Sequence, residues 1–330
     1  MYLRSMKIDL KEVALSKMLG IDLPIIVAPM FLVSNTKMVI EAVNAGATGA
    51  IPALNYRTVE DLKEAIKELR EQANGPFGFN LIVNKSNFLY KEQLKVLCDE
   101  KVDFIITSLG SPRETIEAAH KAGVKVFCDV TDLKYALKVQ ELGADAVIAV
   151  NKEAGGHAGN LSYKELIPML REKLEIPVIS AGGVGNGHEA HEMLSFGADG
   201  LSMGSVFIAS EEADVSDDYK QACVEYGKED IVMTTKLSGT PCTVIKTPYV
   251  EKVGTKQNSL ERFLNKNKRL KKWFKALTFM KGMKSLRNAA FSSTYKTVWC
   301  AGPSIEHVKK VAPMREIIKK IKDEFDESNK

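Results

Sequence analysis

The segment Glu153–Gly159 combines three glycines with a single histidine, His157. It follows the apolar run Ala146–Val150, which is typical of a buried parallel strand. Glycines at a strand end allow close approach of a flat or anionic ligand, and histidine can exchange a proton near neutral pH. The pattern indicates a catalytic or ligand-binding loop. The alternative is a glycine-rich turn with a surface histidine.

Two further apolar runs end in small residues, namely Pro177–Val184 and Gly200–Ser205. The segment from Asn186 to Gly197 lies between them and has helical apolar spacing. Neighbouring parallel strands that end in exposed backbone N–H groups form a phosphate cradle, which barrels place after strands seven and eight. Tight packing of strand on helix also requires glycine and is the alternative.

The elements that must position these loops alternate between strand and helix through the first 205 residues. The expected strands are 25–30, 48–53, 77–83, 104–109, 125–130, 146–150, 177–181 and 200–204, with amphipathic helices such as Thr58–Glu71 between them. This alternation predicts an α/β fold, a (β/α)₈ TIM barrel. An open doubly wound sheet is the alternative, but no GxGxxG follows the first strand.

The pattern changes after Ser205. We expect a helix over 211–230, irregular chain over 231–250, and a closing helix from Ile305 to Phe325. The predicted domains are the barrel at 1–205, a mostly helical add-on at 206–300 that covers the barrel mouth as a lid, and the closing C-terminal helix at 301–330, packed on the barrel.

A basic run at 256–287 contains eleven Lys or Arg and one acidic residue, Glu261. A solvated helical face is one interpretation, and a docking surface for an acidic partner is the other. Nucleic acid is not expected as a partner, because the net charge is only +4 and no recognition module is visible.

Composition places the chain among globular proteins, with 330 residues and 45% hydrophobic content. The five cysteines form no CxxC pair, so we expect free thiols, with Cys98 and Cys128 buried, and no zinc site. His188 and His191 are expected on a helix surface and not as metal ligands. The N-terminus is not typical of a signal peptide and no apolar run is long enough to span a bilayer, so a cytoplasmic protein is expected, with no membrane partner.

Several motifs in barrel order resemble the nitronate monooxygenase family, formerly called 2-nitropropane dioxygenases, which are related to FMN-dependent enoyl-acyl-carrier-protein reductases. The matching segments are Pro24–Met30, Gly78–Asn80, Glu153–Gly159, Ala181–Gly183, Ser202–Ser205 and Trp299–Gly302, the last of which resembles a Trp-Ser-Ala-Gly phrase. Two departures stand out. Positions 150–152 read Val-Asn-Lys where many members have Gln, Gly and an aromatic residue, and Phe31–Val33 replaces a frequent Ala-Gly.

The resemblance implies FMN as cofactor and His157 as the catalytic residue. The cofactor-binding residues that it implies are Ala28, Pro29, Met30, Asn80, Asn151, Gly155, Gly156, Gly182, Gly183, Ser202, Met203, Gly204 and Ser205. Asn151 takes the place of the missing Gln. FAD and nicotinamide are not expected to be bound, and Lys125 is expected at the bottom of the barrel.

The function that this resemblance implies is FMN-dependent oxidation of alkyl nitronates or nitroalkanes by dioxygen. His157 would act as a base or as an electrostatic partner. One alternative is an NAD(P)H- and FMN-dependent enoyl-acyl-carrier-protein reductase, whose acidic carrier protein would meet the basic run. Another is a flavin-binding barrel without turnover. The sequence leaves open whether the chain forms a homodimer.

Overall fold

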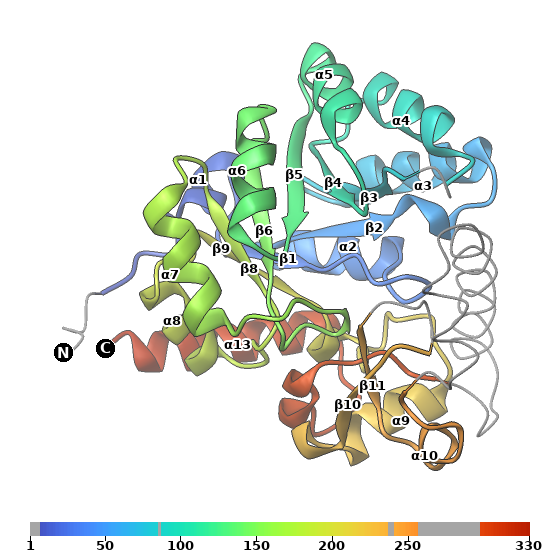
Figure 1. Cartoon of the computed structure of the whole chain (residues 1–330), viewed down its shortest axis with the longest axis vertical. Coiled ribbons are helices and arrows are strands. Elements are labelled where there is room, and N and C mark those ends of the chain that lie inside the picture. Colours follow the sequence, from blue (N-terminus) through green and yellow to red (C-terminus); the bar gives the residue numbers. More distant parts are fainter. Residues whose placement is uncertain (1–6, 85–86, 237–240, 257–297) are drawn as a thin grey trace.

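The computed structural model describes residues 7–84, 87–236, 241–256 and 298–330. Eight parallel strands close into a barrel in the order β1-β2-β3-β4-β5-β6-β8-β9 (Figure 1). They are β1 (Ile25–Val27), β2 (Thr48–Pro52), β3 (Gly78–Ile82), β4 (Phe104–Ser108), β5 (Lys125–Val130), β6 (Ala146–Val150), β8 (Val178–Ala181) and β9 (Gly200–Met203). The predicted TIM barrel and its eight strands are confirmed.

Helices surround the barrel and alternate with its strands. They are α1 (Ala14–Leu19), α2 (Thr36–Asn44), α3 (Val59–Gln72), α4 (Tyr90–Asp99), α5 (Arg113–Ala122), α6 (Leu133–Glu141), α7 (Tyr163–Lys173) and α8 (Gly187–Ser195). Local sequence sets their ends. Thr58 and Asp61 form a capping box at the start of α3, and Gly123 ends α5 in the left-handed conformation at φ +78°.

Side chains fill the inside of the barrel. Phe104 and Phe127 stack with ring centroids 5.0 Å apart, and Ile26, Ile148 and Ile179 are buried with them. A second, larger apolar cluster lies between the strands and the helices. The interior is therefore a packed core, and ligands are confined to the loops at the barrel's end.

The chain after β9 adds a small sheet to the barrel. It begins with η2 (Ser205–Phe207) and α9 (Asp217–Glu225), and continues through η3 (Lys228–Asp230), β10 (Ile231–Thr234), β11 (Cys242–Ile245) and α10 (Pro248–Val253). Figure 1 shows β10, β11, α9 and α10 grouped at one end of the molecule. β11 pairs on one side with β10 and on the other with β7 (Gly156–His157), which comes from the loop after β6. The irregular chain expected over 231–250 thus contains two strands, and the helix expected over 211–230 is shorter.

The expected start of the closing helix at Ile305 is wrong. Residues Pro303–His307 form the short 3₁₀ helix η4, and the α-helix, α13, spans Met314–Ser328. Ala312 forms a β-bridge with Ser210, and Pro313 follows it, so the helix starts only after the proline. α13 packs mainly against α8.

None of the helices within the described ranges is long and apolar enough to cross a membrane. Residues 257–287 of the basic run lie outside the described part of the chain. The predicted division at 205 and 300 stays a prediction.

Candidate active site

A cavity of about 790 Å³ lies at the carboxyl ends of the strands. Its volume is within the range of small-molecule and cofactor sites. Almost all of the predicted site residues line it: Ala28, Pro29, Met30, Asn80, Gly155, Gly156, His157, Gly182, Gly183, Ser202, Met203, Gly204 and Ser205. The structure therefore brings together residues from five of the barrel strands and the loops that follow them.

His157 is held in the cavity wall by the added sheet. Its strand β7 is antiparallel to β11, with His157 opposite Cys242, and the hydroxyl of Thr243 donates to the carbonyl of Ala154 at 2.6 Å. The His157 side chain lines the cavity and is exposed there, with protein atoms near enough to desolvate it in part. Desolvation by these atoms lowers the pKa of His157 below its ordinary value of 6.5. The imidazole is neutral at pH 7 and can accept a proton.

Asn151 is the one predicted site residue that does not line the cavity. It is completely buried, and its Nδ2 donates to the carbonyl of Gly182 at 3.0 Å while its Oδ1 accepts from the N–H of Glu153 at 2.9 Å. The side chain thus ties the histidine loop to the turn after β8. A Cβ on Gly182 would lie 2.3 Å from Asn151 Oδ1, and Gly182 has φ +110°, so only glycine fits this turn.

The turn after β9 meets two other segments at Ser205. The Ser205 Oγ accepts from the N–H of Gly302 at 2.8 Å, which leaves its own proton free to donate. A Cβ on Gly155 would lie 2.7 Å from the same Oγ. The histidine loop and the 298–302 segment are therefore packed together, and both contact the Ser205 side chain of the turn after β9.

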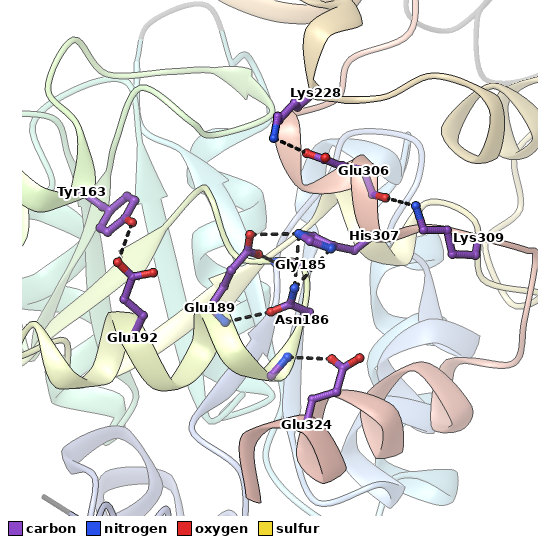
Figure 2. Close-up of polar contacts among 11 residues, drawn as sticks. Tyr163, Gly185, Asn186, Glu189, Glu192, Lys228, Glu306, His307, Lys309 and Glu324 are labelled. Carbon is purple, nitrogen blue, oxygen red and sulfur yellow. Dashed lines mark hydrogen bonds and ion pairs between the residues drawn. The ribbon is translucent and has the colours of Figure 1, made fainter. Parts of the chain in front are cut away.

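At the start of α8, carboxylates accept hydrogen bonds from the backbone N–H groups (Figure 2). Glu189 Oε2 accepts from the N–H of Gly185 at 2.8 Å, and Glu324 of α13 accepts from the N–H of Gly187 at 3.0 Å. His307 contacts Glu189 Oε1 at 2.9 Å, while Nδ2 of Asn186 donates to Nδ1 of His307 at 3.2 Å. The earlier residues of the turn, Gly182 and Gly183, are the ones that face the cavity.

Asp129, near the end of β5, is a cavity residue that the sequence analysis missed. Ser108 Oγ donates to its Oδ2 at 2.5 Å, and Asn80 Nδ2 donates to Ser108 Oγ at 2.7 Å. Burial raises the pKa of Asp129 from 3.8 to about 6, and the Ser108 hydrogen bond opposes that shift. The signal in the sequence that could have identified Asp129 was an acidic residue near the C-terminal end of an expected strand. Lys125, at the other end of β5, does not line the cavity.

The other histidines lie away from the cavity. His120 contacts Asp145 at 2.8 Å. His188 and His191 belong to α8, as predicted, but both meet α13: His188 bonds Ser328 at 2.7 Å, and the His191 ring lies 5.3 Å from that of Phe325. Of the five histidines, His157 is thus the one that lines this cavity.

The site and fold match known proteins. The sequence profile of the nitronate monooxygenase family matches residues 12–89 and 84–324. A Rhodococcus jostii protein named (3aS,4S,5R,7aS)-5-hydroxy-7a-methyl-1-oxo-octahydro-1H-indene-4-carboxyl-CoA dehydrogenase is 31% identical over 81% of this chain and 74% of its own length. A probable nitronate monooxygenase of Staphylococcus saprophyticus is 27% identical over 72% of this chain and 79% of its own.

Solved structures agree. FabK from Thermotoga maritima superposes with a TM-score of 0.83 at 29% identity, over 96% of this chain and 97% of that one. The nitroalkane oxidase from Streptomyces ansochromogenes has a TM-score of 0.79 at 23% identity, over 96% and 98%, which shows the shared fold.

The fold and cavity define a TIM-barrel oxidoreductase of the flavin-dependent class. This chain belongs to the nitronate monooxygenase family, which is related to the FMN-dependent enoyl reductases.

Proposed function

We propose that the chain binds FMN and oxidises alkyl nitronates or nitroalkanes with dioxygen. One observation carries the proposal: His157 and the two small-residue turns after β8 and β9 line the same cavity. A titratable group and a phosphate cradle in the lining of one cavity fit a flavin whose reactive ring meets the substrate beside the histidine.

The residues present fit FMN. The turns at Gly182–Gly183 and Gly204–Ser205 would hold the phosphate, and glycine at position 182 lets the first of these turns pack closely against Asn151 and Ala154. Ala28–Met30 and Asn80 would meet the ring. The bound FMN would accept electrons from the substrate and pass them to dioxygen.

His157 has a different role for each form of the substrate. A nitroalkane carries an acidic proton on its α-carbon, and the neutral imidazole accepts that proton to give the nitronate anion. A preformed nitronate has no such proton to lose. His157 then supplies a hydrogen bond or, when protonated, a positive charge.

The test measures both the bound cofactor and the turnover of substrate. The purified protein should release FMN on denaturation, and it should consume oxygen with 2-nitropropane or propionate-3-nitronate. Protein that holds no flavin, or flavin that neither substrate reduces under anaerobic conditions, would overturn the proposal.

A second candidate is oxidation or reduction of an acyl thioester. The relative of 31% identity is named as a carboxyl-CoA dehydrogenase, which favours a thioester substrate for this cavity as well. The enoyl-acyl-carrier-protein reductase predicted from the sequence belongs to the same chemical class. Anaerobic bleaching of the flavin by NAD(P)H, followed by reoxidation with crotonyl thioester, would select this function. A flavin that is reduced neither by NAD(P)H nor by the nitro substrates would indicate a binding barrel without turnover.

A further inference from the structure

Two cysteines face each other at the edge of the cavity. Cys242 in β11 and Cys300 in the 298–302 segment have their Sγ atoms 3.7 Å apart, and both residues line the cavity. Cys242 is buried in a cluster with Val244, Val250 and Val298, while Cys300 is partly exposed. The positions are 58 residues apart in sequence, so the fold itself brings the thiols together.

We propose that Cys242 and Cys300 form a reversible disulfide when hydrogen peroxide reaches the cavity. The sulfur atoms would approach by roughly 1.6 Å, from 3.7 Å to the bond length of about 2.05 Å. That movement is small enough for side-chain rotation with a slight shift of β11. The other cysteines, Cys98, Cys128 and Cys223, lie in α4, β5 and α9.

The chemistry proceeds in two balanced steps. The Cys300 thiol reacts with hydrogen peroxide to give a sulfenic acid and one water. The Cys242 sulfur then attacks the Cys300 sulfur, the S–O bond breaks, and a second water leaves with the Cys242 proton. Cys300 reacts first because it is the more exposed thiol, and because the hydrogen bond with Cys300 and, after it, burial raise the pKa of Cys242.

The disulfide would act on the part of the cavity wall that is formed by the His157 strand and the turn at Ser205. β11 pairs Cys242 with His157 on one side, and two residues after Cys300 the N–H of Gly302 bonds Ser205 on the other. Ile245 N–H also donates to the Trp299 carbonyl at 2.9 Å. A covalent link between these two segments would fasten the histidine strand to the turn after β9. Oxidation by peroxide would therefore shift the position of His157 in the cavity, and a dithiol reductant would restore the original position.

The first test counts thiols in the holoenzyme. After hydrogen peroxide and alkylation, free thiols should fall from five to three, and non-reducing peptide mapping should show Cys242 linked to Cys300. Cys98→Ser is the matched control and should fall from four to two. Cys300→Ser and Cys242→Ala should form no link. In Cys242→Ala, Cys300 should accumulate as sulfinic acid, because its resolving partner is missing. Five free thiols in the oxidised wild type, or a link through other cysteines, would overturn the proposal.

The second test asks whether the link reaches His157. The rate of diethyl pyrocarbonate labelling of His157, measured by mass spectrometry, should change by about threefold or more on oxidation, because the imidazole is exposed and the link shifts β11, which pairs with the strand that carries it. A thiol reductant should reverse the change in the wild type and in Cys98→Ser. A disulfide that forms without changing the labelling rate of His157 would refute the coupling between the disulfide and His157.

Discussion

At the scale of single residues, the cavity disfavours charge on His157 and on Asp129. Desolvation lowers the pKa of His157 and raises that of Asp129 to about 6. Both shifts favour the neutral form, so near pH 6 His157 is deprotonated to a greater extent than an ordinary histidine, while about half of the Asp129 carboxyl population is protonated. The cavity thus contains a proton acceptor and a proton donor within the same pH range.

Replacing His157 with Asn should separate the two substrate forms. Turnover of neutral nitroalkanes should fall by roughly 10²–10⁴-fold, the usual contribution of a positioned general base. Turnover of preformed nitronate should fall much less, because no proton leaves carbon. FMN content should stay unchanged, since the predicted phosphate contacts lie on other loops. Steady-state rates on both substrates test this, and equal losses would contradict the base role.

The pH profile offers an independent check of the same residue. His157 must be neutral to accept a proton, and its pKa lies below 6.5. The acid limb of kcat/KM for a nitroalkane should therefore fall below pH 6.5, and it should vanish from the residual activity of His157→Asn. An acid limb above pH 6.5 would place the essential base elsewhere.

Asp129 should make stability depend on pH. Its pKa is about 6 in the folded chain and near 3.8 in the unfolded one, so the folded state keeps a proton that the unfolded state has released. Stability is present below about pH 4 and is lost as pH rises through 6. Relative to Asp129→Asn, the wild type should lose up to about 3 kcal/mol across this window. Urea unfolding of both proteins measures the difference, and parallel pH curves would contradict the shift.

At the scale of elements, the contact between α8 and α13 depends on one glycine. A Cβ on Gly187 would lie 2.1 Å from the carbonyl oxygen of Ile321 and 2.2 Å from the nitrogen of Phe325, both in the backbone of α13. Gly187→Ala should therefore destabilise the protein by about 1–3 kcal/mol, because α13 must move away. Gly227→Ala is the control, since nothing lies within 4 Å of its Cβ. The midpoints of urea unfolding of both variants and the wild type measure the effect. Equal midpoints for Gly187→Ala and the wild type would show that α13 moves away from α8 without loss of stability.

The turn after β9 makes a second prediction at this scale. Gly204→Asp would bring a carboxylate toward the predicted phosphate site, where a Cβ already lies 3.2 Å from Met30 Sδ. FMN occupancy should be abolished by charge repulsion and bulk. Gly227→Asp, remote from the cavity, should keep full occupancy. Flavin absorbance of the purified proteins gives the answer, and a fully loaded Gly204→Asp would place the phosphate elsewhere.

Sequence patterns predicted the elements whose signals are local. Each barrel strand is a short apolar run beside a helix with its own caps, so all eight were predicted. β10 and β11 were missed because their pairing is non-local: β11 meets His157 some 85 residues earlier. The closing helix was started too early, because the bridge of Ala312 to Ser210 cannot be seen in the local pattern.

At the scale of the whole molecule, the site was predictable as a set of loops but not as a set of contacts. Most predicted residues line one cavity because all the loops that lead from a strand to the next helix open at the same end of the barrel. Asn151 instead faces the turn after β8, and Asp129 faces the cavity. Which way a side chain points at a strand end depends on barrel closure, and no window of sequence contains that information.

The pairing of β7 with β11 also sets an order of assembly during synthesis. All eight barrel strands are complete at Met203, whereas the strand that holds His157 in place begins only at Cys242, and Gly302 follows much later. Since chains fold from the N-terminus as they emerge, a nascent barrel can close and present its glycine turns before its histidine is positioned. Under the proposed function, the glycine turns that would hold FMN form before β11 positions His157, so turnover would begin only after residues 242–245 have been synthesised.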